Sequence, residues 1–143
     1  MMKKFEFLEH MADAYIAAYG KDLAEAFENA ALAMFETMTD TAKVEPKVED
    51  EIEVEGFDEQ SLLYNWLESL IVKFEITGNL YSKFKITAIE RTDDGFRLRA
   101  KVWGEPFNLE KHPQKVGIKA VTYHMMEVKK ETGKVTVKFL LDL

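Results

Sequence analysis

The sequence contains no cysteine, few arginines and no long apolar run. Without cysteine, the chain can form no disulfide, thiolate metal site or cysteine nucleophile, so any chemistry must use oxygen and imidazole groups. No stretch of eighteen or more apolar residues occurs, and the N-terminus has neither an apolar signal region nor a small-residue cleavage site. We therefore expect a cytoplasmic protein without a membrane span or a secretory signal.

Acidic residues outnumber basic ones. Lysine and arginine together number 19, aspartate and glutamate number 26, and the formal net charge is −7. Because affinity for phosphate comes from clustered lysine and arginine, we expect no strong direct binding to nucleic acid. The length of 143 residues predicts one domain over residues 1–143.

Hydrophobic periodicity predicts two helices and several strands. One helix begins after Asp22, with Glu25 three residues later as a capping box, and continues to about residue 39. The second begins after Asp58 and ends near Gly78. Strands are expected over 5–7, 14–19, 48–54, 84–89, 96–103, 116–128 and 135–141. Residues 48–54 alternate with glutamates, which is typical of an edge strand protected against aggregation.

These elements predict an α+β fold of two layers, with two main helices packed on one mostly antiparallel or mixed β-sheet. The helices carry wide apolar faces that must be buried, and the later part of the chain reads as consecutive hairpins. Turns are expected at 92–95 and 131–133.

Carboxylates occur near both ends of the chain. Glu9, His10 and Asp13 lie in the connection between the first two strands, while Asp142 precedes Leu143 at the end. Each has an ordinary explanation taken alone: a turn, a surface histidine or a solvated terminus. If the last strand pairs with the second, however, Asp13, Asp142 and the Leu143 carboxylate converge.

Such a convergence would require a cation. Two unit charges 4 Å apart repel by about 4 kcal/mol at an effective dielectric near 20. Oxygen ligands favour Ca²⁺ or Mg²⁺ over Zn²⁺, and calcium tolerates irregular oxygen cages better than magnesium.

The segment GIKAVTYHMMEV is a second candidate, because polar residues interrupt an apolar strand. In a regular strand Lys119 and His124 lie on opposite faces, although a bulge would change that. The methionines at 11, 125 and 126 are expected to belong to the core, with a partner-binding surface as the alternative. His112 is expected to be a solvated loop histidine.

No enzyme class has a positive signal. The sequence lacks a Ser-His-Asp signature, a glycine-rich phosphate loop and an HExxH motif. A metal-dependent hydrolase with His10 or His124 as its base stays open as an alternative.

Three segments carry a family resemblance. The opening FEFLEHMADAYIAAYGKDLAEAFENAALAMFETMTD, the later GIKAVTYHMMEV and the ending VTVKFLLDL together resemble archease over the whole length of the chain. The family's usual opening has threonine where this chain has Met11.

The resemblance implies a non-catalytic activator of the RtcB-type tRNA-splicing ligase, which attaches GMP to its own histidine. The activator would promote guanylylation and multiple turnover and broaden the nucleotide used. The resemblance also implies a bound metal, typically calcium, held by Asp13, Asp142 and Leu143. Residues expected to orient this cluster or contact the ligase are Glu9, His10, Lys119 and His124. The alternative is a chaperone-like role toward other tRNA-processing enzymes, such as a tRNA cytosine-5-methyltransferase.

Overall fold

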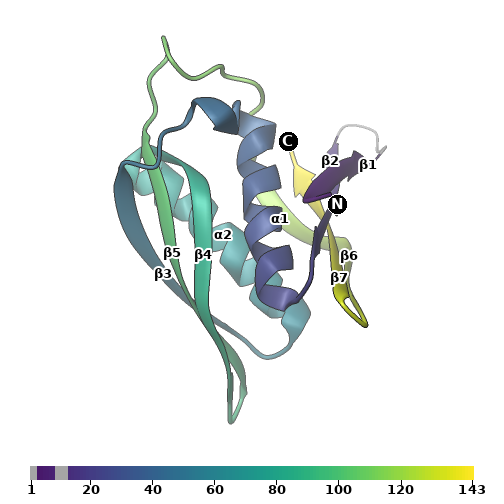
Figure 1. The fold of residues 1–143 in the computed structure, drawn as a ribbon. Helices are drawn as coiled ribbons and strands as arrows, with labels where there is room; N and C mark the ends of the chain where they lie inside the picture. Colours follow the sequence, from purple (N-terminus) through teal and green to yellow (C-terminus); the bar gives the residue numbers. More distant parts are fainter. Residues whose placement is uncertain (1–2, 9–12) are drawn as a thin grey trace.

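The computed structural model describes residues 3–8 and 13–143. Two helices pack with two antiparallel sheets (Figure 1). The elements in chain order are β1 (Phe5–Leu8), β2 (Asp13–Gly20), α1 (Leu23–Met38), the short 3₁₀ helix η1 (Thr41–Lys43), β3 (Val48–Gly56), α2 (Glu59–Thr77), β4 (Asn79–Thr92), β5 (Gly95–Pro106), β6 (Ala120–Glu131) and β7 (Lys134–Asp142). None of the helices in these ranges is long and apolar enough to cross a membrane.

The helices begin where the sequence predicts. The side chain of Asp22 accepts a hydrogen bond from the Glu25 N–H, and that of Asp58 accepts one from the Ser61 N–H. These caps satisfy donors that have no partner inside the helix. Gly78 ends α2 in the left-handed conformation, with φ of 76°, which glycine adopts without a steric penalty.

The α+β class and the antiparallel pairing are confirmed, but the prediction of a single sheet is wrong. One sheet has the order β1-β2-β7-β6 and the other has the order β3-β5-β4. The reason lies in α1, which contacts both β2 of the first sheet and β4 of the second. Its buried residues include neighbouring positions such as Ala30, Ala31 and Ala33, a wider apolar surface than contact with one sheet requires.

The core lies between the helices and the inner faces of the sheets. Trp66 of α2 is fully buried, and its Nε1 donates a hydrogen bond to the main-chain oxygen of Phe27 in α1 at 2.9 Å. The Trp66 ring also meets Phe84 of β4 edge to face. Trp66 therefore joins both helices to the second sheet.

Candidate functional site

The two acidic ends of the chain meet in the first sheet. Asp13, the first residue of β2, lies directly opposite Asp142, the last residue of β7. Residues directly opposite in an antiparallel pair share a face, with their Cβ atoms about 4.5–5.5 Å apart. The predicted convergence of Asp13 with Asp142 is therefore confirmed.

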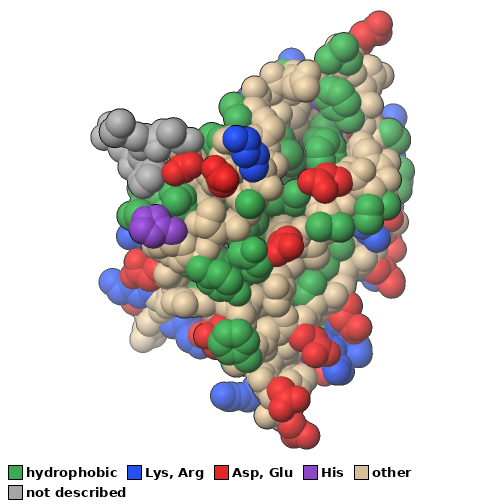
Figure 2. Space-filling view, turned by 180° about the vertical axis from the view of Figure 1, so that it is seen from behind, with side chains coloured by type: hydrophobic (Ala, Val, Ile, Leu, Met, Phe, Trp, Pro, Cys, Tyr) green, Lys and Arg blue, Asp and Glu red, His purple; other side chains and the backbone are tan. Residues whose placement is uncertain are grey.

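Asp142 lies on the face of β7 opposite Val137, Phe139 and Leu141, which are fully buried, and it is exposed. Leu140 shares the face of Asp142 but is buried, so the exposure of Asp142 reflects its position at the end of the strand. On its other side Asp142 lies opposite Ala120 of β6, and its main-chain oxygen accepts a hydrogen bond from the Lys119 N–H at 2.8 Å. Figure 2 shows acidic side chains and a basic side chain beside the residues drawn in grey, with a histidine nearby.

The donor types at this sheet end fit a hard cation, but the donor number is small. Asp13 and Asp142 supply carboxylate oxygens and Leu143 supplies main-chain oxygen, whereas calcium takes six to eight oxygen ligands. Among residues 3–8 and 13–143, no three His, Cys, Asp or Glu side chains are close enough to form a metal site. Glu9 and His10 lie outside the described residues. Donors beyond those of the described residues would have to complete the shell.

A large bulge in β6 contains His124, whereas Lys119 lies just before the strand begins. The β6–β7 register shifts between Thr122 and Glu127, so residues 123–126 lie opposite Phe139 alone. The regular alternation that would separate Lys119 from His124 therefore ends at Thr122, so the strand does contain a bulge, after which its pairing with β7 resumes at Glu127. Residues 123–126 are Tyr, His, Met and Met, and nothing in this local pattern indicates a bulge before the pairing with β7 is known.

The bulge exposes side chains beside α2. Met125 has a φ of 60°, which is uncommon for a residue other than glycine, and it is 44% exposed. Its prediction as core is wrong, because the bulge turns it outward, whereas Met126 is buried. Met11 lies outside the described residues. The Tyr123 ring stacks on Tyr64 of α2 with 4.4 Å between ring centres, and the exposed His124 donates its N–H to the Thr122 hydroxyl.

The prediction that His112 is solvated is wrong, because the loop after β5 folds its ring inward. Its Nδ1 accepts a hydrogen bond from the Asn108 N–H, so Nε2 carries the proton and donates to Glu105 at 2.9 Å. Burial raises the pKa of Glu105, but hydrogen bonds from Lys111, the Glu45 N–H and His112 outweigh burial and hold the pKa at about 2. The hydrogen bond between His112 and Glu105 anchors this loop, and no sequence motif indicates this contact.

We expect the Glu105→Gln variant to lose less stability than the wild type when the pH is lowered. A folded-state pKa of about 2, below the ordinary value of 4.5, means that ionised Glu105 stabilises the fold above pH 4.5. That contribution disappears as the pH falls from 4.5 through 2. Urea unfolding at pH 6 and pH 3 should show a smaller drop for the variant than for the wild type. Equal drops would show that Glu105 is not a stabilising anion.

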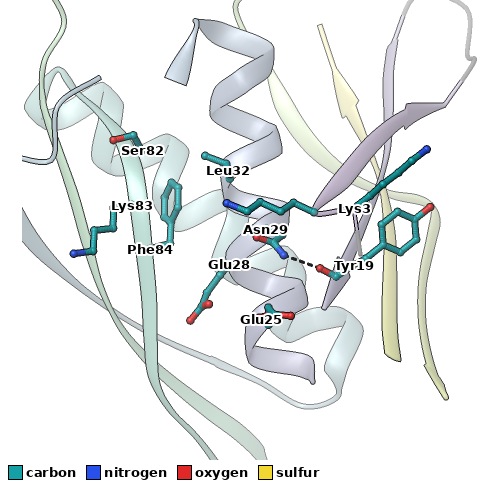
Figure 3. A pocket seen from close by; sticks show the side chains of 10 residues that line it. Lys3, Tyr19, Glu25, Glu28, Asn29, Leu32, Ser82, Lys83 and Phe84 are labelled. Atoms are coloured by element: carbon teal, nitrogen blue, oxygen red, sulfur yellow. Dashed lines mark hydrogen bonds between the residues drawn. The ribbon is translucent and has the colours of Figure 1, made fainter. Parts of the chain in front are cut away.

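A groove of about 450 Å³ runs beside α1 (Figure 3). Lys3 and Tyr19 border one side, Ser82 and Lys83 border the other, and Glu28 lies between them. The Glu28 carboxylate accepts a hydrogen bond from the Ile86 N–H at 2.8 Å, and burial raises its pKa. These contacts tie α1 to β4. We find no paired nucleophile and base among the described residues that line this groove.

Known proteins resemble the chain over its whole length. A model of the Archease protein family (MTH1598/TM1083) matches residues 5–143. The protein archease of Sulfurisphaera tokodaii is 46% identical over 142 residues, which cover 99% of this chain and 100% of the relative. That of Methanothermobacter thermautotrophicus is 47% identical over 142 residues, with the same coverage.

Solved structures agree. The solution structure of Methanobacterium thermoautotrophicum protein 1598 superposes with a TM-score of 0.87 at 47% identity, covering 99% of this chain and 100% of that one. A Thermotoga maritima crystal structure, described as an archease and possible chaperone, shares the fold with a TM-score of 0.62 at 19% identity, covering 100% of this chain and 98% of that one. The chain belongs to the archease family.

Proposed function

We propose that this protein is a non-catalytic activator of the RtcB-type tRNA-splicing ligase, promoting guanylylation and multiple turnover and broadening the nucleotide accepted. Membership of the archease family supports this proposal. The observation that carries it is the pairing of Asp13 with Asp142 at an exposed sheet end. Such a pair can be presented to the active site of another protein.

The adjacent carboxylates support a cation site. Two negative charges on neighbouring strands repel, and a divalent ion between them removes the repulsion. Asp13, Asp142 and the main-chain oxygen of Leu143 would hold it, and the oxygen donors favour calcium. When bound, the ion would supply positive charge that offsets phosphate oxygens in nucleotidyl transfer.

The residues around the pair suit a positioning role. The Lys119 N–H holds the main-chain oxygen of Asp142, which fixes the end of β7 against the start of β6. The Lys119 side chain is exposed on this segment, and the bulge carries His124 to the surface farther along β6. We propose that both contact the ligase. Glu9 and His10 would act from the segment that precedes Asp13.

A single-turnover guanylylation assay tests the proposal. Ligase and GTP are mixed with and without this protein, and the ligase–GMP adduct is followed over time. We expect faster adduct formation and more ligation cycles when the protein is present. Equal rates at saturating protein would contradict an activating role.

Two further experiments separate the alternative functions. Release of phosphate or nucleotide products by the isolated chain with Ca²⁺, Mg²⁺ or Mn²⁺ would indicate a hydrolase that uses His10 or His124. Co-purification with a tRNA methyltransferase, without the ligase, would instead indicate the chaperone-like role.

A further inference from the structure

The outer edge of the second sheet combines an open strand, an apolar groove and a row of glutamates. In the order β3-β5-β4, β3 is an edge strand that pairs only with β5 among the described strands (Figure 1). The β3–β5 pairing covers all of Val48–Gly56 without a register shift. An exposed edge of this length can pair with another extended chain.

One hydrogen bond fixes which main-chain groups face outward. The Asn65 side chain in α2 donates to the main-chain oxygen of Glu55 at 2.7 Å, so this oxygen points away from β5. Main-chain directions repeat every second residue in a strand. The N–H and C=O groups of Glu51 and Glu53 therefore also point outward.

The inner border of this edge is apolar. A groove of about 570 Å³ lies between β3 and α2, and the apolar part of its lining comes from Ile52 and Val54 of the strand and from Val72 and Ile76 of the helix. Val72 is 43% exposed and Ile76 is 77% exposed. In Figure 2 hydrophobic side chains reach the surface with acidic side chains among them. Solvent-facing glutamates protect a sheet edge from aggregation, whereas the exposed Val72 and Ile76 side chains offer no such protection.

The outer border is acidic. Glu49, Glu51, Glu53 and Glu55 alternate along β3 on the solvent face. Arg99 and Arg97 of β5 pair with Glu53 and Glu55, whose side chains remain 57% and 65% exposed. The groove lining itself includes Glu51, Glu53 and Glu55 of this row, together with Glu68 and one basic residue, Lys73. Acid therefore predominates along this edge.

We propose that β3 and α2 form a docking groove for an extended segment of a partner protein in which basic and apolar residues alternate. Main-chain groups of the segment would bond Glu51 and Glu53, as in strand addition to a sheet edge. Side chains on one face would fill the groove, and lysines or arginines on the other would lie beside the glutamate row. A second copy of this chain fits poorly, because pairing β3 with β3 would bring glutamates against glutamates.

This groove is separate from the carboxylate pair. Asp13 and Asp142 belong to the first sheet, whereas the groove borders the second. A partner could therefore occupy the groove while the acidic pair remains accessible.

The test uses a fluorescein-labelled peptide that alternates lysine with valine or isoleucine over seven residues. Its control is a scrambled peptide of the same composition without alternation. Fluorescence anisotropy should show tighter binding of the alternating peptide, and its affinity should fall as salt is raised. Amide resonances of Glu51 and Glu53 should shift in NMR spectra. Equal binding of both peptides would overturn the proposal, since charge alone would explain it.

A proline substitution tests the main-chain contact. The Glu51 N–H points away from β5, so Glu51→Pro leaves the sheet paired, whereas Glu51→Gln removes only the charge. We expect the affinity for the peptide to fall at least about tenfold further in Glu51→Pro than in Glu51→Gln, because proline removes the main-chain N–H that bonds the peptide.

Two further results test the groove and decide whether a partner segment or a second copy of this chain occupies it. Ile76→Gln removes apolar surface at an exposed site without adding a charge, so it should also weaken peptide binding, and this variant serves as the test if Glu51→Pro alters the circular dichroism spectrum. Unchanged peptide binding by Ile76→Gln would overturn the docking groove. A dimer in sedimentation that Glu51→Pro dissociates would show that a second copy is the occupant instead.

Discussion

Replacing Asp142 with asparagine is expected to reduce ligase guanylylation to the rate of ligase alone. The change removes one negative charge from a pair of carboxylates on adjacent strands and keeps the size of the side chain. Asp142 is exposed, and the buried contacts of this strand come from the apolar residues before it, so the fold should be unchanged. The single-turnover assay measures the effect, with circular dichroism as the check on folding.

A matched control is Asp94→Asn. Asp94 is also exposed, lies in the turn between β4 and β5, and tolerates asparagine before Gly95. This variant should stimulate the ligase fully. Full stimulation by Asp142→Asn as well would refute a role for the carboxylate pair.

The partner carboxylate gives a second check. If Asp13 and Asp142 hold one ion together, Asp13→Asn should cause a similar loss, and the double variant should be no worse than either single one. Independent, multiplying effects would indicate two separate roles.

Replacing Trp66 with alanine is expected to lower the free energy of unfolding by about 3–5 kcal/mol, a large part of the roughly 5–15 kcal/mol that stabilises a domain. Trp66 has no exposed surface and bonds the Phe27 oxygen through Nε1. Its loss leaves a cavity where both helices meet β4. Urea unfolding should show the midpoint reduced by roughly 2 M, given typical slopes.

Two variants separate burial from position in the helix. Ile76→Ala, in the same helix but 77% exposed, should change stability by less than about 0.5 kcal/mol. Trp66→Phe keeps most of the volume and should lose less than Trp66→Ala. Equal losses for Trp66→Ala and Ile76→Ala would contradict the described core.

The helices and the meeting of the chain ends could be predicted from local chemistry. Asp22, Asp58 and Gly78 act through contacts within a few residues, so their patterns are readable in the sequence. Alternation in β7 likewise placed Asp142 on the face opposite Val137, Phe139 and Leu141. The pairing of Asp13 with Asp142 was a conditional expectation, since alternation does not say which strands are neighbours.

The features that the sequence did not predict depend on contacts between segments that are distant in the chain. Two sheets form on either side of α1, which contacts both β2 and β4, and the wide apolar surface of α1 does not say which strands it will contact. Buried His112 donates a hydrogen bond from Nε2 to Glu105 across the loop, a pairing visible only after folding. The bulge at 123–126 follows from the pairing of β6 with β7.

A calorimetric titration of Ca²⁺ into the isolated protein tests the central claim most directly. If Asp13 and Asp142 together hold a cation, the wild type should bind one ion, and Asp13→Asn and Asp142→Asn should each weaken binding by at least about tenfold, or 1.4 kcal/mol. Asp94→Asn should bind as the wild type does. Absence of binding by the wild type, or equal affinity in all four proteins, would contradict the account.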